Sequence, residues 1–262
     1  MANRGDFTGL AHDYHLHRPN YSDSVLSGLV GLLDRPLDAI DFADIGAGTG
    51  IWTRMVAQKG PRSTVAIEPN AEMRRVGQSG NDNHSISWLE GSAEDSGLNS
   101  NSIDWVTMAS SFHWAESEIA LREFHRVLRP QGIFTALWNP RRIEGSPLLE
   151  RIEAEIRRLK PDLVRVSSGW SGITEVLEDL IVESGLFEDV VYIEARHAIV
   201  MSPERYVGAW RSVNDLRVQL GSEAFDEFLS FVVRSVENEP CIETEYVTRA
   251  WSARCAKSRA QD

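Results

Sequence analysis

From about residue 40 onward, short runs of apolar and β-branched residues alternate with segments in which apolar residues recur every three or four positions. The first pattern predicts buried strands and the second predicts amphipathic helices. Strands are expected at residues 40–45, 64–68, 86–90, 103–109 and 132–138, and helices at residues 51–59, 71–78 and 116–128. This alternation is typical of a parallel sheet covered by helices.

The second half of the chain is richer in helical pattern. Helices are predicted at residues 146–159, 173–184, 203–218 and 223–237, a loop at 161–172, and strands at 190–200 and 244–256. In the first of these helices, Glu153 and Arg157 are expected to pair on the face away from the apolar stripe. Two late strands added to five early ones predict a Rossmann-like α/β fold. We expect a seven-stranded, mostly parallel sheet with helices on both faces and a helical lid.

Charge and composition exclude several classes of function. The chain has 262 residues and 42% hydrophobic content, enough for one sizeable core, and its formal net charge is −12. Phosphate backbones and anionic membranes would repel such a chain. Neither a signal peptide nor a run of about 18 apolar residues is visible in the sequence. We therefore expect a cytoplasmic chain that binds neither nucleic acid nor membrane, and the sequence indicates no oligomeric state.

The clearest chemical signal is the segment DFADIGAGTG at residues 41–50. A predicted strand ends at Ile45, and three glycines then lead into a predicted helix. Glycines permit positive φ and leave no Cβ between the backbone and a ligand. The next strand ends at Glu68, whose carboxylate can accept both hydroxyls of a ribose.

Two other interpretations of this turn remain. One is a tight strand-to-helix turn followed by a solvated glutamate. The other is a nicotinamide dinucleotide site, but its glycines are spaced GxGxxG, whereas this chain has GxGxG.

Several motifs between residues 7 and 138 resemble those of class I S-adenosylmethionine-dependent methyltransferases, in particular the subgroup that includes trans-aconitate methyltransferase. DIGAGTG and VAIEPNAEM resemble the first two motifs of the family, and EGSAED and EFHRVLRPQG resemble later ones. The segment from Tyr14 to Tyr21 resembles its YxxxRPxY pattern. The chain departs from the family at Ser92, where Asp is frequent, and at Gln131, where Gly is usual.

The resemblance implies that S-adenosylmethionine is the cofactor. The glycine turn would lie at its methionine part, Glu68 at its ribose, and Arg18 is suited to its carboxylate. The residues expected to bind the cofactor are Tyr14, Arg18, Asp44, Gly46, Ala47, Gly48, Glu68, Pro69, Met73, Ser92, Ala93, Glu94, Ala109 and Ser110. The N-terminal segment, residues 1–21, is expected to be a mobile lid, although it could instead be an ordinary helix flank.

In the resembling family the end of the fourth strand faces the methyl group, which makes His113 the candidate general base. The alternative is a histidine that only donates or accepts a hydrogen bond and shapes the pocket. The residues expected to contact the methyl acceptor are Tyr21, Trp114, Trp138 and Arg141. No metal site is expected, because the histidines at 12, 15 and 17 have no carboxylate or cysteine at ligand spacing.

The expected function is transfer of a methyl group from S-adenosylmethionine to an oxygen or nitrogen of a small-molecule metabolite. An RNA or protein methyltransferase and a nicotinamide-dependent oxidoreductase remain as alternatives. We expect one methyltransferase domain over the whole chain. Its predicted parts are an N-terminal lid and helix at residues 1–34, a cofactor-binding core at 35–139, pocket and lid elements at 140–240, and a final strand and tail at 241–262.

Overall fold

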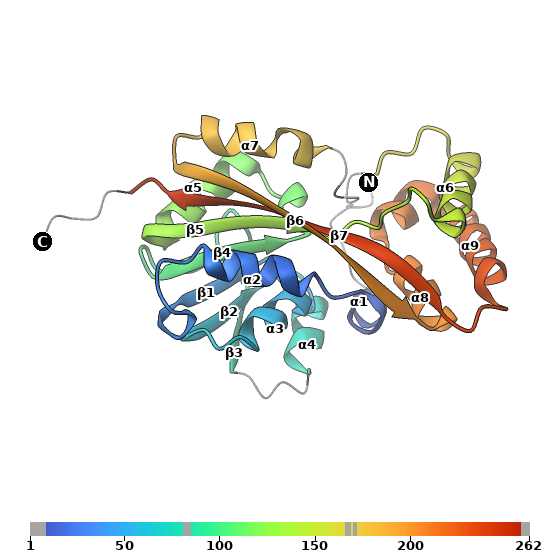
Figure 1. Cartoon of the computed structure of the whole chain (residues 1–262), viewed down its shortest axis with the longest axis horizontal. Helices are drawn as coiled ribbons and strands as arrows, with labels where there is room; N and C mark the ends of the chain where they lie inside the picture. Colours follow the sequence, from blue (N-terminus) through green and yellow to red (C-terminus); the bar gives the residue numbers. More distant parts are fainter. Residues whose placement is uncertain (1–8, 81–84, 166–168, 170–171, 258–262) are drawn as a thin grey trace, which may run out of the picture.

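A seven-stranded sheet with the strand order β3-β2-β1-β4-β5-β7-β6 runs through the computed structural model (Figure 1), which describes residues 9–80, 85–165, 169 and 172–257. The strands are β1 (Asp41–Ile45), β2 (Ser63–Ile67), β3 (Ile86–Leu89), β4 (Ile103–Ala109), β5 (Leu128–Trp138), β6 (Phe187–Met201) and β7 (Ile242–Cys255). The first five strands pair in parallel, and β7 pairs antiparallel with both β5 and β6. The predicted fold class is confirmed.

Helices cover both faces of the sheet. They are α1 (Ala11–His17), α2 (Asp23–Gly31), α3 (Ile51–Ala57), α4 (Ala71–Gln78), α5 (Ser117–Val127), α6 (Pro147–Leu159), α7 (Ile173–Glu183), α8 (Pro203–Arg211) and α9 (Asn214–Val236), with short 3-10 helices η1 (Leu37–Ala39) and η2 (Phe112–Trp114). Leu26 of α2 and Trp52 of α3 pack in one core cluster, and Phe124 of α5 and Leu177 of α7 pack in another. Figure 1 shows α5 and α7 on the opposite side of the sheet from α2 and α3. Burial of these apolar faces is the main driving force for the layered arrangement.

The lid consists of α6, α8 and α9 and is carried by the long ends of β6 and β7, which run past the sheet (Figure 1). It has its own apolar cluster, in which Ile152 of α6, Trp210 of α8 and Phe228 of α9 are buried. Tyr246 of β7 belongs to the same cluster. The two long strands therefore connect the lid to the sheet.

The structure corrects two predictions in the lid. The helix predicted at residues 203–218 ends at Arg211, and a new helix begins at Asn214 and continues to Val236 with a kink at Gly221. Glu153 does not point to solvent as expected, because it is buried and forms an ion pair with Arg165 at 2.7 Å. The helical periodicity of the sequence continues through the break after Arg211 and through the position of Glu153. Only the packing of the folded chain shows that the helix ends and that Glu153 is buried.

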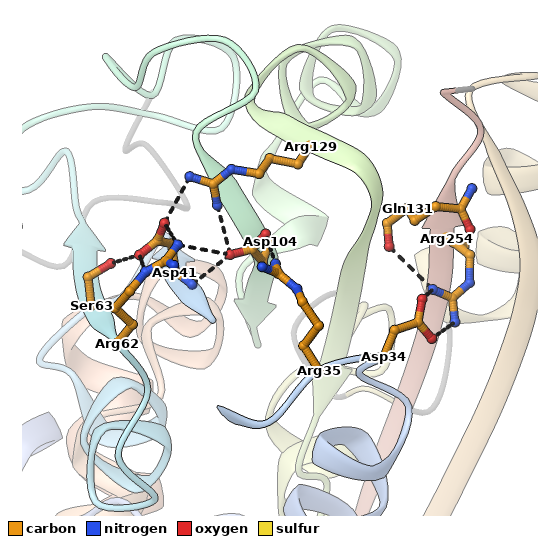
Figure 2. A network of polar contacts seen from close by, with 9 residues as sticks. All are labelled: Asp34, Arg35, Asp41, Arg62, Ser63, Asp104, Arg129, Gln131 and Arg254. Carbon is orange, nitrogen blue, oxygen red and sulfur yellow. Dashed lines mark hydrogen bonds and ion pairs between the residues drawn. The ribbon is translucent and has the colours of Figure 1, made fainter. Parts of the chain in front are cut away.

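A network of ion pairs connects the residues at the edge of the sheet where the parallel strands begin. Asp41 of β1 and Asp104 of β4 lie between Arg35, Arg62 and Arg129 (Figure 2). At the same edge, Arg254 at the end of β7 donates to Asp34 and to the Gln131 carbonyl at 2.8 and 3.3 Å.

Gln131, the departure from the family at this turn, has a φ of 67°. It therefore adopts the left-handed conformation that a glycine would adopt without strain. Gln131 lies within β5, where the pairing of β5 with β4 shifts register. This departure therefore lies at the edge of the sheet opposite the predicted cofactor motifs.

Candidate active site

A cavity of about 370 Å³ lies at the carboxyl edge of the parallel strands, between the sheet, α1 and the lid. This is the edge at which open α/β sheets bind ligands. The cavity brings together every predicted site residue except Asp44, namely Tyr14, Arg18, Tyr21, Gly46, Ala47, Gly48, Glu68, Pro69, Met73, Ser92, Ala93, Glu94, Ala109, Ser110, His113, Trp114, Trp138 and Arg141.

The glycine turn after β1 forms one wall of this cavity. Gly46 has a φ of 67°, and a Cβ at this position would lie 2.8 Å from the Cβ and Oγ atoms of Ser111. The backbone amides of Gly46 and Ala47 donate to the Ile67 carbonyl at 2.8 and 3.0 Å, which joins the turn to β2. Only glycine fits at position 46, and the open backbone lets a ligand approach closely.

Glu68 is fixed beside this turn. Its side chain is 7% exposed, and its two carboxylate oxygens accept from the backbone amides of Gly48 and Asn70 at 2.7 and 2.8 Å. Burial raises the pKa of the Glu68 carboxyl, while these two hydrogen bonds lower it. Each carboxylate oxygen has a further lone pair, so Glu68 can accept two hydroxyl groups without moving.

Asp44 lies behind the turn rather than in the cavity wall. It is fully buried, and it accepts from the Thr53 and Thr107 hydroxyls at 2.6 and 2.8 Å. Burial raises the pKa of its carboxyl to about 7. Asp44 thus connects β1 to α3 and β4, and it stabilises the glycine turn from behind.

Ser92, at the position where the family often has Asp, belongs to the loop after β3. Its hydroxyl accepts from the backbone amides of Glu94 and Asp95, both at 3.2 Å. The side chain of Glu94 in turn accepts from the Glu116 amide at 2.8 Å. The loop is therefore held in shape by its own polar side chains, and the Ser92 hydroxyl proton remains available as a donor.

Helix α1 and the segment that follows it supply aromatic and basic groups to the cavity. Arg18 donates to the hydroxyl and the carbonyl of Ser212 at 2.8 and 3.0 Å, and it stacks on the Tyr14 ring at 5.0 Å. The Tyr21 and Ser110 hydroxyls lie 2.9 Å apart within hydrogen-bonding distance. Ser110 has a φ of 54°, a strained conformation of the kind that concentrates at functional sites.

His113 lies deep in the cavity next to Trp138. The indole Nε1–H of Trp138 can only donate, and it lies 3.2 Å from His113 Nδ1. Nδ1 must then be the acceptor, which places the proton of the neutral ring on Nε2. Burial lowers the pKa of His113 to about 4, so the ring is neutral at physiological pH.

Arg141, which the sequence analysis selected, stacks on the Trp210 ring of the lid at 4.1 Å. Other residues that line this part of the cavity were not selected. The Arg165–Glu153 ion pair forms the adjacent wall. Asn214 and Asp215, the first residues of α9, also line the cavity. The one signal in the sequence was Ser-Val-Asn-Asp at residues 212–215, because such polar residues favour the start of a helix.

Metal-binding clusters and membrane-spanning helices are both absent from the described residues. Within the described ranges, no group of three or more His, Cys, Asp or Glu side chains is arranged to hold a metal ion. No helix in the described part of the chain is long and apolar enough to cross a membrane.

Comparison with known proteins gives the class of enzyme. Residues 43–136 match the methyltransferase domain family. An uncharacterized methyltransferase of Schizosaccharomyces pombe is 25% identical over 250 residues, which cover 92% of this chain and 93% of that protein. A methyltransferase-like protein of the same yeast is 30% identical over 152 residues, and the alignment spans 57% of each chain.

Solved structures share the fold. A protein described as a type II methyltransferase, from Anaeromyxobacter dehalogenans, superimposes with a TM-score of 0.59 and 20% identity over 90% of this chain and 97% of that one. Phosphoethanolamine N-methyltransferase 2 of Haemonchus contortus, in complex with S-adenosyl-L-methionine, gives a TM-score of 0.54 and 14% identity over 98% of this chain and 59% of that one.

Residues 43–136 therefore match a methyltransferase domain, and the chain is an enzyme of the methyltransferase class. The domain match and the fold support the expected class I S-adenosylmethionine-dependent group. The resemblance to the trans-aconitate methyltransferase subgroup stays a prediction.

Proposed function

We propose that the chain binds S-adenosylmethionine between the glycine turn and Glu68 and transfers its methyl group to an oxygen or nitrogen of a small-molecule metabolite. The observation that carries this proposal is one continuous cavity, which is lined both by the glycine turn and Glu68 and by residues of the lid. When bound, S-adenosylmethionine supplies a methyl group that its sulfonium has already activated. The protein's own contribution is then to bind, orient and enclose the reactants.

The size and the walls of the cavity favour a small acceptor. A volume of about 370 Å³ falls within the range of small-molecule sites. We call the part of the cavity lined by His113, Trp138, Arg141, Asp215 and Tyr246 the acceptor half, and the lid covers it. The formal net charge of −12 disfavours nucleic acid as a partner. Trp114, Trp138 and Arg141 would contact the acceptor, and Tyr21 would position it through Ser110. We place the enzyme in the cytoplasm, as one methyltransferase domain with its lid.

Glu68 provides the direct test of the cofactor site. Glu68→Ala should weaken binding of S-adenosylhomocysteine about tenfold to a hundredfold, because a hydrogen bond to a charged group contributes about 1.5–3 kcal/mol. Isothermal calorimetry measures the affinity, and Glu68→Gln serves if the alanine variant does not fold. Glu118→Gln, an exposed carboxylate of α5 outside the cavity, is the matched control. Wild-type protein that binds no S-adenosylhomocysteine would overturn the proposal.

A further inference from the structure

Several buried polar atoms of cavity-lining residues, Arg165 Nε among them, make no hydrogen bond to any residue that the structure describes. Three of these atoms matter here: His113 Nε2, Asp215 Oδ2 and Tyr246 Oη. Buried polar groups are nearly always paired in proteins, because an unpaired one has lost its hydrogen bonds to water without replacement. Three such atoms around one cavity indicate that the missing partners belong to a ligand.

Asp215 is the most unusual of the three. Its side chain is 1% exposed, and its Oδ1 accepts from the Leu216 amide at 3.0 Å. The other oxygen accepts no hydrogen bond from the described residues. Arg18 interacts with Asp215 electrostatically but donates its own hydrogen bonds to Ser212. An ionised carboxylate in this position requires a donor to offset its desolvation.

The break between α8 and α9 places Asp215 in this position. The apolar periodicity of the sequence does not show this break. α8 ends at Arg211, and Ser212 is tied to Arg18 by two hydrogen bonds before α9 begins. The first turn of α9 then places Asn214 and Asp215 in the cavity wall. A carboxylate that only capped the helix would not need to line the cavity.

His113 presents the complementary group. Because Trp138 occupies Nδ1, the Nε2 atom carries a hydrogen and is a donor. Both side chains line the same cavity. The negative charge of Asp215 raises the pKa of His113, against the larger effect of burial. The cavity therefore offers one strong acceptor and one donor to the same small molecule.

We propose that Asp215 binds the O–H or N–H of the methyl acceptor and accepts its proton during transfer, while His113 Nε2–H holds a second, lone-pair-bearing atom of the same molecule. This inference rests on the proposed function. The lone pair of the acceptor oxygen or nitrogen forms the bond to the methyl carbon, and the carbon–sulfur bond breaks with its electrons going to sulfur. The proton passes to Asp215 Oδ2 and then to water.

The proposal defines the substrate class as a hydroxyl or amine on an apolar or planar frame. Trp138, Ile143, Val213 and Tyr246 supply apolar and aromatic walls around the two polar groups. A carbon nucleophile would give Asp215 no hydrogen bond and would leave the buried carboxylate unpaired.

Three probes of the same shape test this assignment. Phenol, aniline and toluene differ only in the group attached to the ring, which is a hydroxyl, an amine or a methyl. With the protein saturated by S-adenosylhomocysteine, phenol or aniline should bind about tenfold or more tightly than toluene. NMR titration measures the three dissociation constants, and the better of phenol and aniline shows whether the site prefers oxygen or nitrogen.

Asp215→Asn should reduce this preference to less than about threefold, because an amide replaces the charged acceptor by a weaker one. Asp226→Asn, an exposed position on the same helix, is the matched control and should keep the wild-type preference. Equal binding of all three probes by the wild type overturns the inference even if the variant does not fold. A preference that survives in Asp215→Asn overturns it as well. Binding of S-adenosylhomocysteine, measured separately, shows whether the proposed function itself has failed.

Discussion

At the scale of a single residue, His113 illustrates how the surroundings decide a role. Its pKa is lowered to about 4, mainly by burial, from an ordinary value of about 6.5. A neutral ring with its hydrogen on Nε2 donates a hydrogen bond from that atom. We therefore propose that His113 is a hydrogen-bond donor, in place of the general base that the sequence analysis expected. The sequence indicates where His113 lies, but the partner that fixes its tautomer is Trp138, which lies 25 residues further along the chain at the end of β5.

We predict that His113 stays neutral down to about pH 5. NMR of ¹⁵N-labelled histidine should show a protonated Nε2 and an unprotonated Nδ1 at pH 7. Because the folded pKa lies below the unfolded one, His113 contributes stability above about pH 6.5 that is lost as the pH falls toward 4. His113→Gln should therefore make the free energy of unfolding fall less steeply over this range. A histidine signal that titrates near pH 6.5 would contradict the prediction.

At the scale of elements, the sheet was predictable and the lid less so. Each early strand coincides with a short apolar run, and each cofactor motif lies directly after its strand, so local sequence locates both. The acceptor half depends on contacts between α6, α9 and β7, which are distant in the sequence. Glu153 could not be distinguished from a surface residue, and Asp215 was hidden inside a predicted helix.

The contact between α1 and α8 supports a prediction about the N-terminal segment, of which residues 1–8 lie outside the described residues. A methyl group at Gly208 would lie 2.2 Å from Cδ2 of the His17 ring. Alanine normally favours a helix over glycine by about 1 kcal/mol, but here it would displace α1 and with it Tyr14 and Arg18. Gly208→Ala should weaken binding of S-adenosylhomocysteine on the order of tenfold, measured by calorimetry.

The double variant Gly208→Ala, His17→Ala removes the clash and should recover most of the affinity. His17→Ala alone is the control for loss of the imidazole. Hydrogen exchange of residues 11–18 should become faster in Gly208→Ala and return toward the wild-type rate in the double variant. If Gly208→Ala binds as tightly as the wild type, the position of α1 does not control the cofactor site.

At the scale of the whole molecule, the two ends of the parallel strands contribute differently, one to the ligand cavity and the other to stability. The carboxyl edge holds the cavity with its unpaired polar atoms, whereas the other edge holds the saturated ion network of Figure 2. In that network Asp41 accepts from the Ser63 hydroxyl and the Arg129 guanidinium at 2.7 and 2.9 Å and is paired with Arg62. Stability and chemistry are thus separated along the strands, so a change at one edge should leave the other unaffected.

Asp41→Asn tests this separation. Its hydrogen bonds, that to Arg62 above all, hold the pKa of the Asp41 carboxyl well below its usual range. A depressed folded pKa contributes stability above about pH 3.9 that is lost as the pH falls further. The variant should lose about 1–2 kcal/mol of unfolding free energy at pH 7, a value reduced by solvent screening. Denaturant titrations at pH 7 and pH 3 should show that the variant loses less unfolding free energy on acidification than the wild type does.

Asp38→Asn, an exposed neighbour, is the control. Affinity for S-adenosylhomocysteine should not change in either variant, and a large loss of affinity in Asp41→Asn would show that the two edges are coupled.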